Sequence, residues 1–218
     1  MKLVDEAPSV IGAAPEDLNS EQQVVDPAVS RAKFDAEIRA YRAIEKDQVR
    51  LGWWLLEADF PKVFVVFAAP QLKPPAVICG VQLDFTNYDL EPPSVRLVDP
   101  FTRVPYRSNQ LPTVMLRRQI KSIPALQAAG LAGAQATTDV PLLQAHHPDD
   151  IPFLCVPGVL EYHRHPAHTG DSWLTHRGLG AGTLINLLSV IYQYGVRPIA
   201  SYGIGLQVVG FHQNEPPQ

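Results

Sequence analysis

The sequence has few cysteines, no strong excess of either charge and no long hydrophobic run. Two cysteines among 218 residues are too few for a disulfide framework, so we expect a reducing, cytoplasmic setting. The longest apolar runs, such as VFVVFAAP and LINLLSVIY, fall short of the ~20 residues that a membrane span needs. The start, MKLVDEAPSV, lacks a signal-peptide pattern, so we expect neither secretion nor a membrane partner.

The charge pattern also gives no reason to expect a nucleic-acid partner. The net charge is −4, which provides no broad basic surface for phosphates. A local cluster of Arg117, Arg118 and Lys121 is interpreted as the solvated face of a short helix within LPTVMLRRQIKSI. The 21 prolines are about twice the usual share and favour ordered loops and edge strands over a helical bundle.

The chain is expected to consist of a leader and one domain. Residues 1–25 are acidic, contain proline and lack periodicity, which predicts a flexible leader. Residues 26–218 would then form a single domain. Asp26 and Pro27 indicate a helix start, and apolar residues at helical spacing predict an amphipathic helix over residues 27–47: Phe34, Ile38 and Tyr41.

The next part of the chain has the pattern of a sheet. The segments LGWWLLEADF, KVFVVFAAP, AVICGVQLDF and SVRLVDP are rich in aromatic and β-branched residues and are separated by prolines. Four such strands with short connections predict an antiparallel meander, in which Cys79 is packing. An α+β fold follows, because nothing helical interrupts the strands.

After the four predicted strands, the sequence pattern indicates the secondary structure less clearly. The residues ALQAAGLAGAQATT fit a helix or a loose excursion, and residues 151–178 form a loop-rich stretch. Residues 181–194 space their apolar side chains as a buried helix that ends at Gly195. The tail ASYGIGLQVVGF predicts a last strand.

The stretch CVPGVLEYHRHPAHTGDSW contains the side chains best suited to bind a metal or to act in catalysis. Thiolate, carboxylate and imidazole are all zinc ligands, and an extended backbone would present alternate residues on one face. The predicted ligand set is Cys155, Glu161, His163, His165 and His168. A variant of this hypothesis places the metal on Glu161 and the histidines alone, whereas His146 and His212 receive no role.

The same stretch also fits a reactive thiol. Imidazoles close to Cys155 would lower its pKa, and Asp149 or Glu161 would orient or deprotonate an incoming amine. The two hypotheses compete for one sulfur, because a zinc-bound thiolate is largely quenched as a nucleophile. Solvated histidines beside a packed cysteine are the remaining alternative.

The order of elements resembles that of ubiquitin-conjugating enzymes. YDLEPPSVRLVDP looks like the segment that closes the meander in that family, and His147-Pro148-Asp149 looks like its His-Pro-Asn. FLCVP puts Cys155 where the family has its catalytic cysteine, and Trp173 with the following helix is similar to the family's tryptophan and helix. The resemblance implies Cys155, Asp149 and His147 as catalytic-site residues, with a ubiquitin-like protein and its activating enzyme as partners.

Two departures limit the resemblance. EYHRHPAHTGD lengthens the distance from cysteine to tryptophan, and the charge of Asp149 opposes the oxyanion role of the family's asparagine. The stretch also resembles a bacterial family of the same fold class with a predicted metal-binding Cys-Glu-His-His signature, associated with operons for ubiquitin-like conjugation. The expected function is therefore a conjugating enzyme with a thioester on Cys155. The alternative is a non-catalytic, zinc-binding adaptor of such a pathway.

Overall fold

The structure is a computed structural model that describes residues 22–122 and 135–203. The predicted leader lies outside the described residues except for its last four. The Asn87 side chain holds all four. Its oxygen accepts hydrogen bonds from the Val24 nitrogen at 2.9 Å, the Val25 nitrogen at 3.3 Å and the Gln23 side chain at 3.4 Å, and its nitrogen donates to the Gln22 oxygen at 3.0 Å.

The first element is the predicted helix, α1, which runs over Pro27–Arg50. The Asp26 carboxylate caps it by accepting a hydrogen bond of 2.9 Å from the Ala28 nitrogen, and Pro27 occupies the first turn, where its missing N–H costs nothing. Phe34 and Tyr41 are buried on one face, as their spacing predicted.

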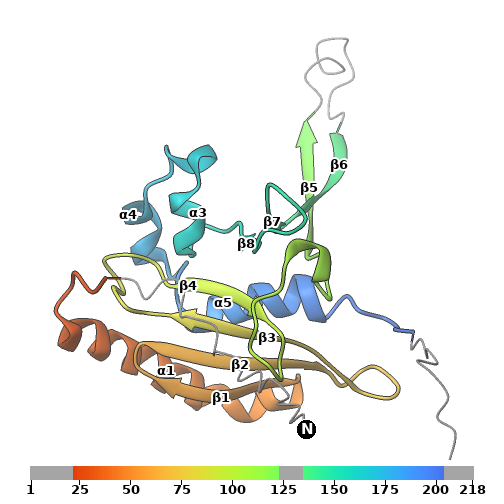
Figure 1. Cartoon of the computed structure of the whole chain (residues 1–218), viewed down its shortest axis with the longest axis horizontal. Helices are drawn as coiled ribbons and strands as arrows, with labels where there is room; N and C mark the ends of the chain where they lie inside the picture. The colour runs from red at the N-terminus through yellow and green to blue at the C-terminus, as the bar shows by residue number, and fades with distance from the viewer. Residues whose placement is uncertain (1–21, 123–134, 204–218) are drawn as a thin grey trace, which may run out of the picture.

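A four-stranded antiparallel sheet follows α1 and confirms the predicted meander (Figure 1). Its strands lie in chain order, as short connections between antiparallel neighbours require. They are β1 (Trp53–Asp59), β2 (Lys62–Ala69), β3 (Ala76–Asp84) and β4 (Ser94–Val98). The fold is therefore α+β, with one helix before the sheet and further helices after it.

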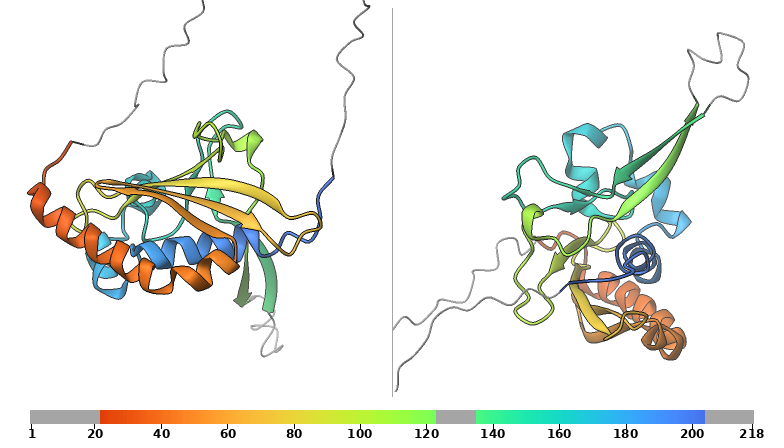
Figure 2. Two further views of the ribbon diagram at one scale, coloured as in Figure 1. Left: turned by 90° about the horizontal axis from the view of Figure 1, so that it is seen from below. Right: turned by 90° about the vertical axis from the view of Figure 1, so that its right-hand side faces the viewer.

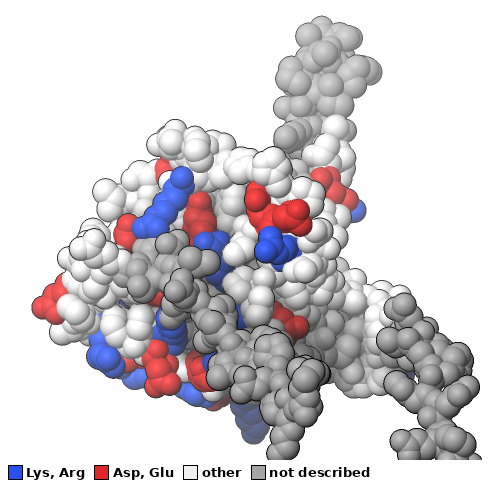
Figure 3. Space-filling model, viewed as in Figure 1, with Lys and Arg blue, Asp and Glu red and all other residues white. Residues whose placement is uncertain are grey.

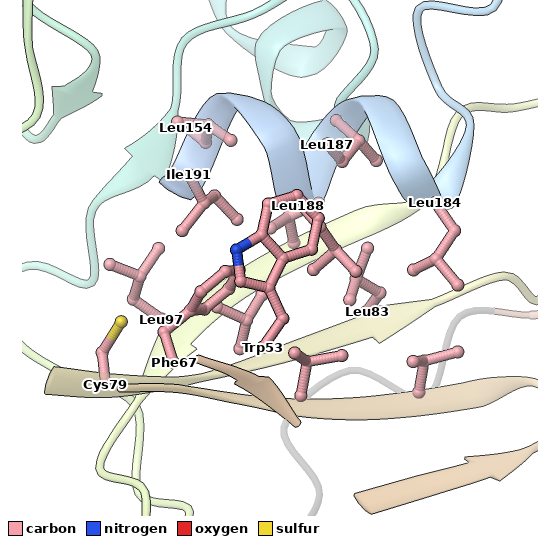
Figure 4. Packing of buried hydrophobic residues seen from close by; sticks show 14 of the residues in the cluster. Trp53, Phe67, Cys79, Leu83, Leu97, Leu154, Leu184, Leu187, Leu188 and Ile191 are labelled. Atoms are coloured by element: carbon pink, nitrogen blue, oxygen red, sulfur yellow. The ribbon is translucent and has the colours of Figure 1, made fainter. Parts of the chain in front are cut away.

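The predicted C-terminal helix is α5, Leu184–Ile191, and it lies beside α1 on one face of the sheet (Figure 2). Its buried side chains are Leu184, Leu187, Leu188 and Ile191. Leu184, Leu188 and Ile191 point toward the strand residues Trp53, Phe67, Leu83 and Leu97 (Figure 4). Glu37 of α1 accepts a hydrogen bond of 3.0 Å from the Leu184 nitrogen, so α1 satisfies one of the unpaired donors at the start of α5.

The prediction that α5 ends with Gly195 in a C′ position was wrong. Gly195 lies inside η4, a π-helical turn over Tyr192–Val196, and its φ is not positive. A Cβ there would come within 2.6 Å of the Met115 methyl group. Glycine at this position leaves room for the Met115 side chain of a second segment, a contact that the local sequence does not reveal.

The residues between β4 and α5 form small sheets and short helices rather than one continuous layer. The short helix expected within LPTVMLRRQIKSI is instead a strand, β5, paired with β6. These strands are β5 (Leu116–Ser122) and β6 (Gln135–Pro141), followed by β7 (Leu143–Gln144) and β8 (Phe153–Leu154). The described part of ALQAAGLAGAQATT belongs to β6, and its remainder lies outside the described residues.

The loop-rich stretch contains several short helical turns. They are α3 (Leu160–Arg164), η2 (Pro166–His168), α4 (Trp173–His176) and η3 (Arg177–Leu179), while η1 (Ser108–Gln110) precedes β5. In Figure 1, α3 and α4 lie above one end of the sheet and the β5–β6 hairpin projects from the body. Most of the tail predicted as a last strand, and His212, lie outside the described residues.

Charged side chains of both signs are interspersed on the face shown in Figure 3. Among the described residues, no single helix is long and apolar enough to cross a membrane. The segments Trp173–Leu179 and Leu184–Val196 pass that test only when taken together, and they are bent by 97° at the break between them.

Candidate functional site

Backbone hydrogen bonds fix the position of Cys155. The residue directly follows β8, and its nitrogen donates to the Leu142 oxygen at 2.7 Å. The Leu142 nitrogen in turn donates to the Met115 oxygen at 2.9 Å, just before β5. Three segments distant in sequence thus meet side by side at the base of the projecting hairpin.

Cys155 lies against one of the predicted histidines. Its sulfur is 3.4 Å from Nε2 of His168, within hydrogen-bond distance for a sulfur atom. His168 is part of η2, thirteen residues further along the chain. The sulfur is neither sealed in the core nor fully exposed, so the pair forms a half-buried thiol–imidazole site.

Electrostatics around the sulfur differ from the expectation that imidazoles lower its pKa. Burial raises the pKa of the Cys155 thiol, and the nearby charge of Arg117 opposes that rise without cancelling it. The thiol is therefore the favoured form at neutral pH, and nucleophilic attack would need a base. His168 is the group in position to take the proton.

A tyrosine connects this pair to an acidic residue. The Tyr162 ring stacks on the His168 ring with centroids 4.0 Å apart and planes 22° apart. Its hydroxyl donates to Oδ2 of Asp171 at 2.6 Å, while the other carboxylate oxygen is 2.5 Å from Nε2 of His176. These two hydrogen bonds hold the pKa of Asp171 below its usual value.

Glu161 is not directed at the sulfur. Its carboxylate accepts a hydrogen bond from the Ser94 hydroxyl and lies 3.1 Å from Nη2 of Arg96. The Val95 nitrogen is also 3.3 Å away. Glu161 therefore fastens α3 to β4. This ion pair gives its carboxylate a partner other than a metal.

The other two predicted ligands also have separate partners. His163 places Nδ1 2.9 Å from the Asp171 carbonyl oxygen and Nε2 2.6 Å from that of Pro157. His165 places Nε2 3.2 Å from Nε2 of His146, to which the sequence assigned no role.

The structure does not bring the five predicted zinc ligands together. In the part of the chain that it describes, no three His, Cys, Asp or Glu residues are arranged to hold a metal. The expected extended backbone is a helical turn at Glu161 and His163, so residues two apart point in nearly opposite directions. Within the set, Cys155 and His168 lie within hydrogen-bond distance of each other, and the rings of His165 and His168 are 5.7 Å apart.

His147 and Asp149 lie in an exposed turn before β8. Oδ1 of Asp149 accepts a hydrogen bond from Asn109 at 3.0 Å, and its backbone oxygen accepts one from Arg107 at 2.7 Å. The His147 nitrogen donates to Oδ2 of Asp150 at 2.8 Å. The hydrogen bonds of Asp149 thus tie this turn to η1, which is a structural role.

Arg117 and Tyr162 were missed as site residues. Arg117 was assigned to a solvated helix face, yet it lies in β5, and its charge acts on both Cys155 and Tyr162. Its Nε atom is buried and has no hydrogen-bond partner among the described residues. The only available signal was alternation along LRRQI, which fits a strand as well as a helix.

Comparison with known proteins identifies the family of the chain. Residues 25–199 match the sequence profile described as "Y4jH-like: Y4jH family". The "Uncharacterized protein y4jH" of Sinorhizobium fredii (strain NBRC 101917 / NGR234) is 46% identical over 199 residues, which cover 91% of this chain and 97% of that protein. The match includes the sheet, the two core helices and the whole Cys155 site, so the chain belongs to the Y4jH family.

Proposed function

We propose that this protein is a thiol-dependent acyl transferase of the conjugating type, which accepts a ubiquitin-like protein as a thioester on Cys155 and passes it to an amine. The observation that carries the proposal is the separation of 3.4 Å between the Cys155 sulfur and Nε2 of His168. A half-buried thiol beside an imidazole is the arrangement that activates a cysteine nucleophile.

The surrounding elements agree with the resemblance to ubiquitin-conjugating enzymes. A helix, a four-stranded meander, a cysteine at the end of a short strand and a final core helix follow one another in the order expected of that family. Trp173 is buried and donates from Nε1 to the Asp89 carbonyl at 3.0 Å, so it ties α4 to the loop before β4. The partners proposed on this basis are a ubiquitin-like protein and its activating enzyme, in the cytoplasm.

The proposed reaction has two transfer steps. In the first, the Cys155 proton moves to Nε2 of His168 and the thiolate attacks the activated carbonyl carbon. The bond from that carbon to the activating enzyme's thiol breaks, and the displaced thiolate takes up a proton. In the second, an amine attacks the thioester and loses its proton to solvent, while His168 returns its proton to the Cys155 sulfur, which leaves as a thiol. The positive charge of Arg117 would stabilise negative charge on the Cys155 sulfur in both steps, as the sulfur attacks in the first and as it leaves in the second.

A zinc site is the alternative for the same sulfur. Zinc bonds of about 2.3 Å to sulfur and 2.0 Å to nitrogen at tetrahedral angles would separate the two donors by about 3.5 Å. The observed 3.4 Å is compatible with that geometry. A closed zinc site needs four donors, however, and the described residues contain no group of three. We therefore rank the reactive thiol first.

The proposal is tested with an activated acyl group. The full chain is incubated with a glycine-terminated peptide thioester of a small thiol, and intact mass is measured before and after adding reductant. We expect one reductant-sensitive adduct, present in Cys79→Ala, absent in Cys155→Ser and formed more slowly in His168→Asn. A folded protein that forms no adduct on Cys155 would contradict the proposal.

Elemental analysis of the same samples separates the two candidates. Stoichiometric zinc that is lost in Cys155→Ser but retained in Cys79→Ala would favour the adaptor. Where an activating enzyme, ATP and a ubiquitin-like protein are supplied together, the reactive-thiol proposal expects the same reductant-sensitive bond to form at Cys155.

A further inference from the structure

Tyr162 has a position that packing alone does not explain. It is only 9% exposed, yet its hydroxyl reaches a carboxylate near the surface and its ring covers the His168 imidazole. The two contacts are on opposite parts of one rigid side chain. A side chain held at its tip and stacked along its face has little freedom to move.

The contacts of Tyr162 form a continuous path to the sulfur. His176 of α4 holds Oδ1 of Asp171, and Oδ2 of Asp171 holds the Tyr162 hydroxyl. The Tyr162 ring then stacks on His168, and Nε2 of His168 faces the Cys155 sulfur. Each step is a direct contact between neighbouring side chains.

We infer that Tyr162, held by Asp171, is a positioning residue that keeps the His168 imidazole aimed at the Cys155 sulfur. The inference rests on the proposed function, in which His168 takes the thiol proton. Tyr162 stacks on His168, which faces the sulfur, so it acts through His168. Asp171 acts one step further away, by fixing the phenol.

Stacking also suits the charge that His168 acquires when it takes a proton. The face of a phenol ring carries partial negative charge and attracts a cation whose centre lies within about 6 Å. The Tyr162 ring lies against the His168 ring with centroids 4.0 Å apart, within that range. Other groups around the pair are Arg117, His163, whose ring is 5.0 Å from that of Tyr162, and His165, whose ring is 5.7 Å from that of His168.

A double-mutant cycle tests the inference. The rate of Cys155 alkylation by iodoacetamide at neutral pH is measured by peptide mass spectrometry on the full chain, for wild type, Tyr162→Leu, His168→Asn and the double variant. Tyr162→Leu should slow alkylation about tenfold when His168 is present and less than about twofold when it is absent. Tyr106→Leu, which alters a half-buried tyrosine elsewhere, serves as the matched control and should leave the rate unchanged.

A conservative variant separates stacking from the hydroxyl. Tyr162→Phe keeps the ring in its buried slot and should retain at least about a third of the wild-type rate. If Tyr162→Leu does not fold, Asp171→Ala replaces it in the cycle, because that change frees the hydroxyl without deleting a buried ring. It should slow alkylation about twofold, and only in the His168 background.

The outcomes distinguish failure of the inference from failure of the proposed function. Equal slowing with and without His168, or a Tyr162→Phe variant as slow as Tyr162→Leu, would overturn the positioning role alone. A His168→Asn variant that alkylates as fast as wild type would overturn the thiol–imidazole pair and the inference with it.

Discussion

The two cysteines lie in two regions that give their thiols different environments. Cys79 is in the middle of β3, opposite Phe67 of β2, and is fully buried (Figure 4). Burial alone raises the pKa of its thiol to about 12. Cys155 is half-buried at the end of β8, where burial also raises its pKa but the charge of Arg117 opposes the rise.

The difference lies in what surrounds each sulfur. The sheet region buries Cys79 within the hydrophobic core cluster, so its thiol serves as a small apolar group. The segment from Cys155 to His176 instead places polar side chains in contact with one another through short helical turns. The sheet region therefore surrounds its thiol with core packing, whereas the second region places its thiol beside an imidazole.

The largest expected effect is a difference in reactivity between the two thiols. Iodoacetamide should modify Cys155 about a thousandfold or more faster than Cys79 in the folded protein, because Cys79 reacts only when the sheet opens. In concentrated urea the two rates should converge. Mass spectrometry of the two peptides measures both rates in one sample. Comparable rates without denaturant would remove the contrast.

The next effect concerns stability. Phe67→Ala should lower the free energy of unfolding by about 3–5 kcal/mol, because it leaves a cavity where the side chain is fully buried. Phe153→Ala, which alters a half-buried ring stacked on His165, should cost less than about 1.5 kcal/mol. Urea unfolding followed by circular dichroism gives both values. If Phe153→Ala lowered the free energy of unfolding as much as Phe67→Ala, the site region would be part of the same core.

A smaller effect separates two neighbouring arginines of β5. Arg117→Gln removes the positive charge that lowers the pKa of Cys155, so that pKa should rise and neutral-pH alkylation should slow about three- to tenfold. Arg118→Gln is the matched control, because Arg118 is exposed and pairs with Asp139 at 3.4 Å. The pH dependence of alkylation should shift to higher pH in the first variant only. Equal behaviour of both would mean that Arg117 exerts no specific field on the sulfur.

The sheet region could be predicted from sequence because its signals are local. Apolar spacing located α1 and α5, and β-branched runs between prolines located four strands. The burial of Cys79 followed from its place within such a run. In each case the residue's neighbours in sequence share its environment, so periodicity is sufficient.

The site could be predicted only in part, because its contacts are non-local. Cys155 and His168 were among the selected residues, but Glu161 turned out to bind Arg96 on a strand far away in sequence. The strand nature of β5, and hence the place of Arg117, depends on pairing with β6. Histidine density indicated where chemistry was possible, but the choice of partners was made by tertiary packing.

The smallest expected effect is on the melting temperature, and it tests how much the ionised Asp171 carboxylate stabilises the site region. Hydrogen bonds from Tyr162 and His176 lower the pKa of Asp171 in the folded state. An acid with a lowered pKa stabilises the fold above its unfolded pKa of about 3.9, and this contribution is lost as pH falls through the folded value. The melting temperature of wild type should therefore exceed that of Asp171→Asn near neutral pH, and the gap should close as the pH falls through the lowered pKa of Asp171 in the folded protein.

The size of that gap should be modest, because solvent screens charges that lie near the surface. Asp47→Asn, which alters an exposed residue of α1, provides the control and should give little difference at either pH. If the Asp171→Asn gap persists unchanged into acid, the ionised carboxylate is not what holds Tyr162. The neutral side chain would then be sufficient, and the stack on His168 would depend on burial of the Tyr162 ring rather than on its hydrogen bond.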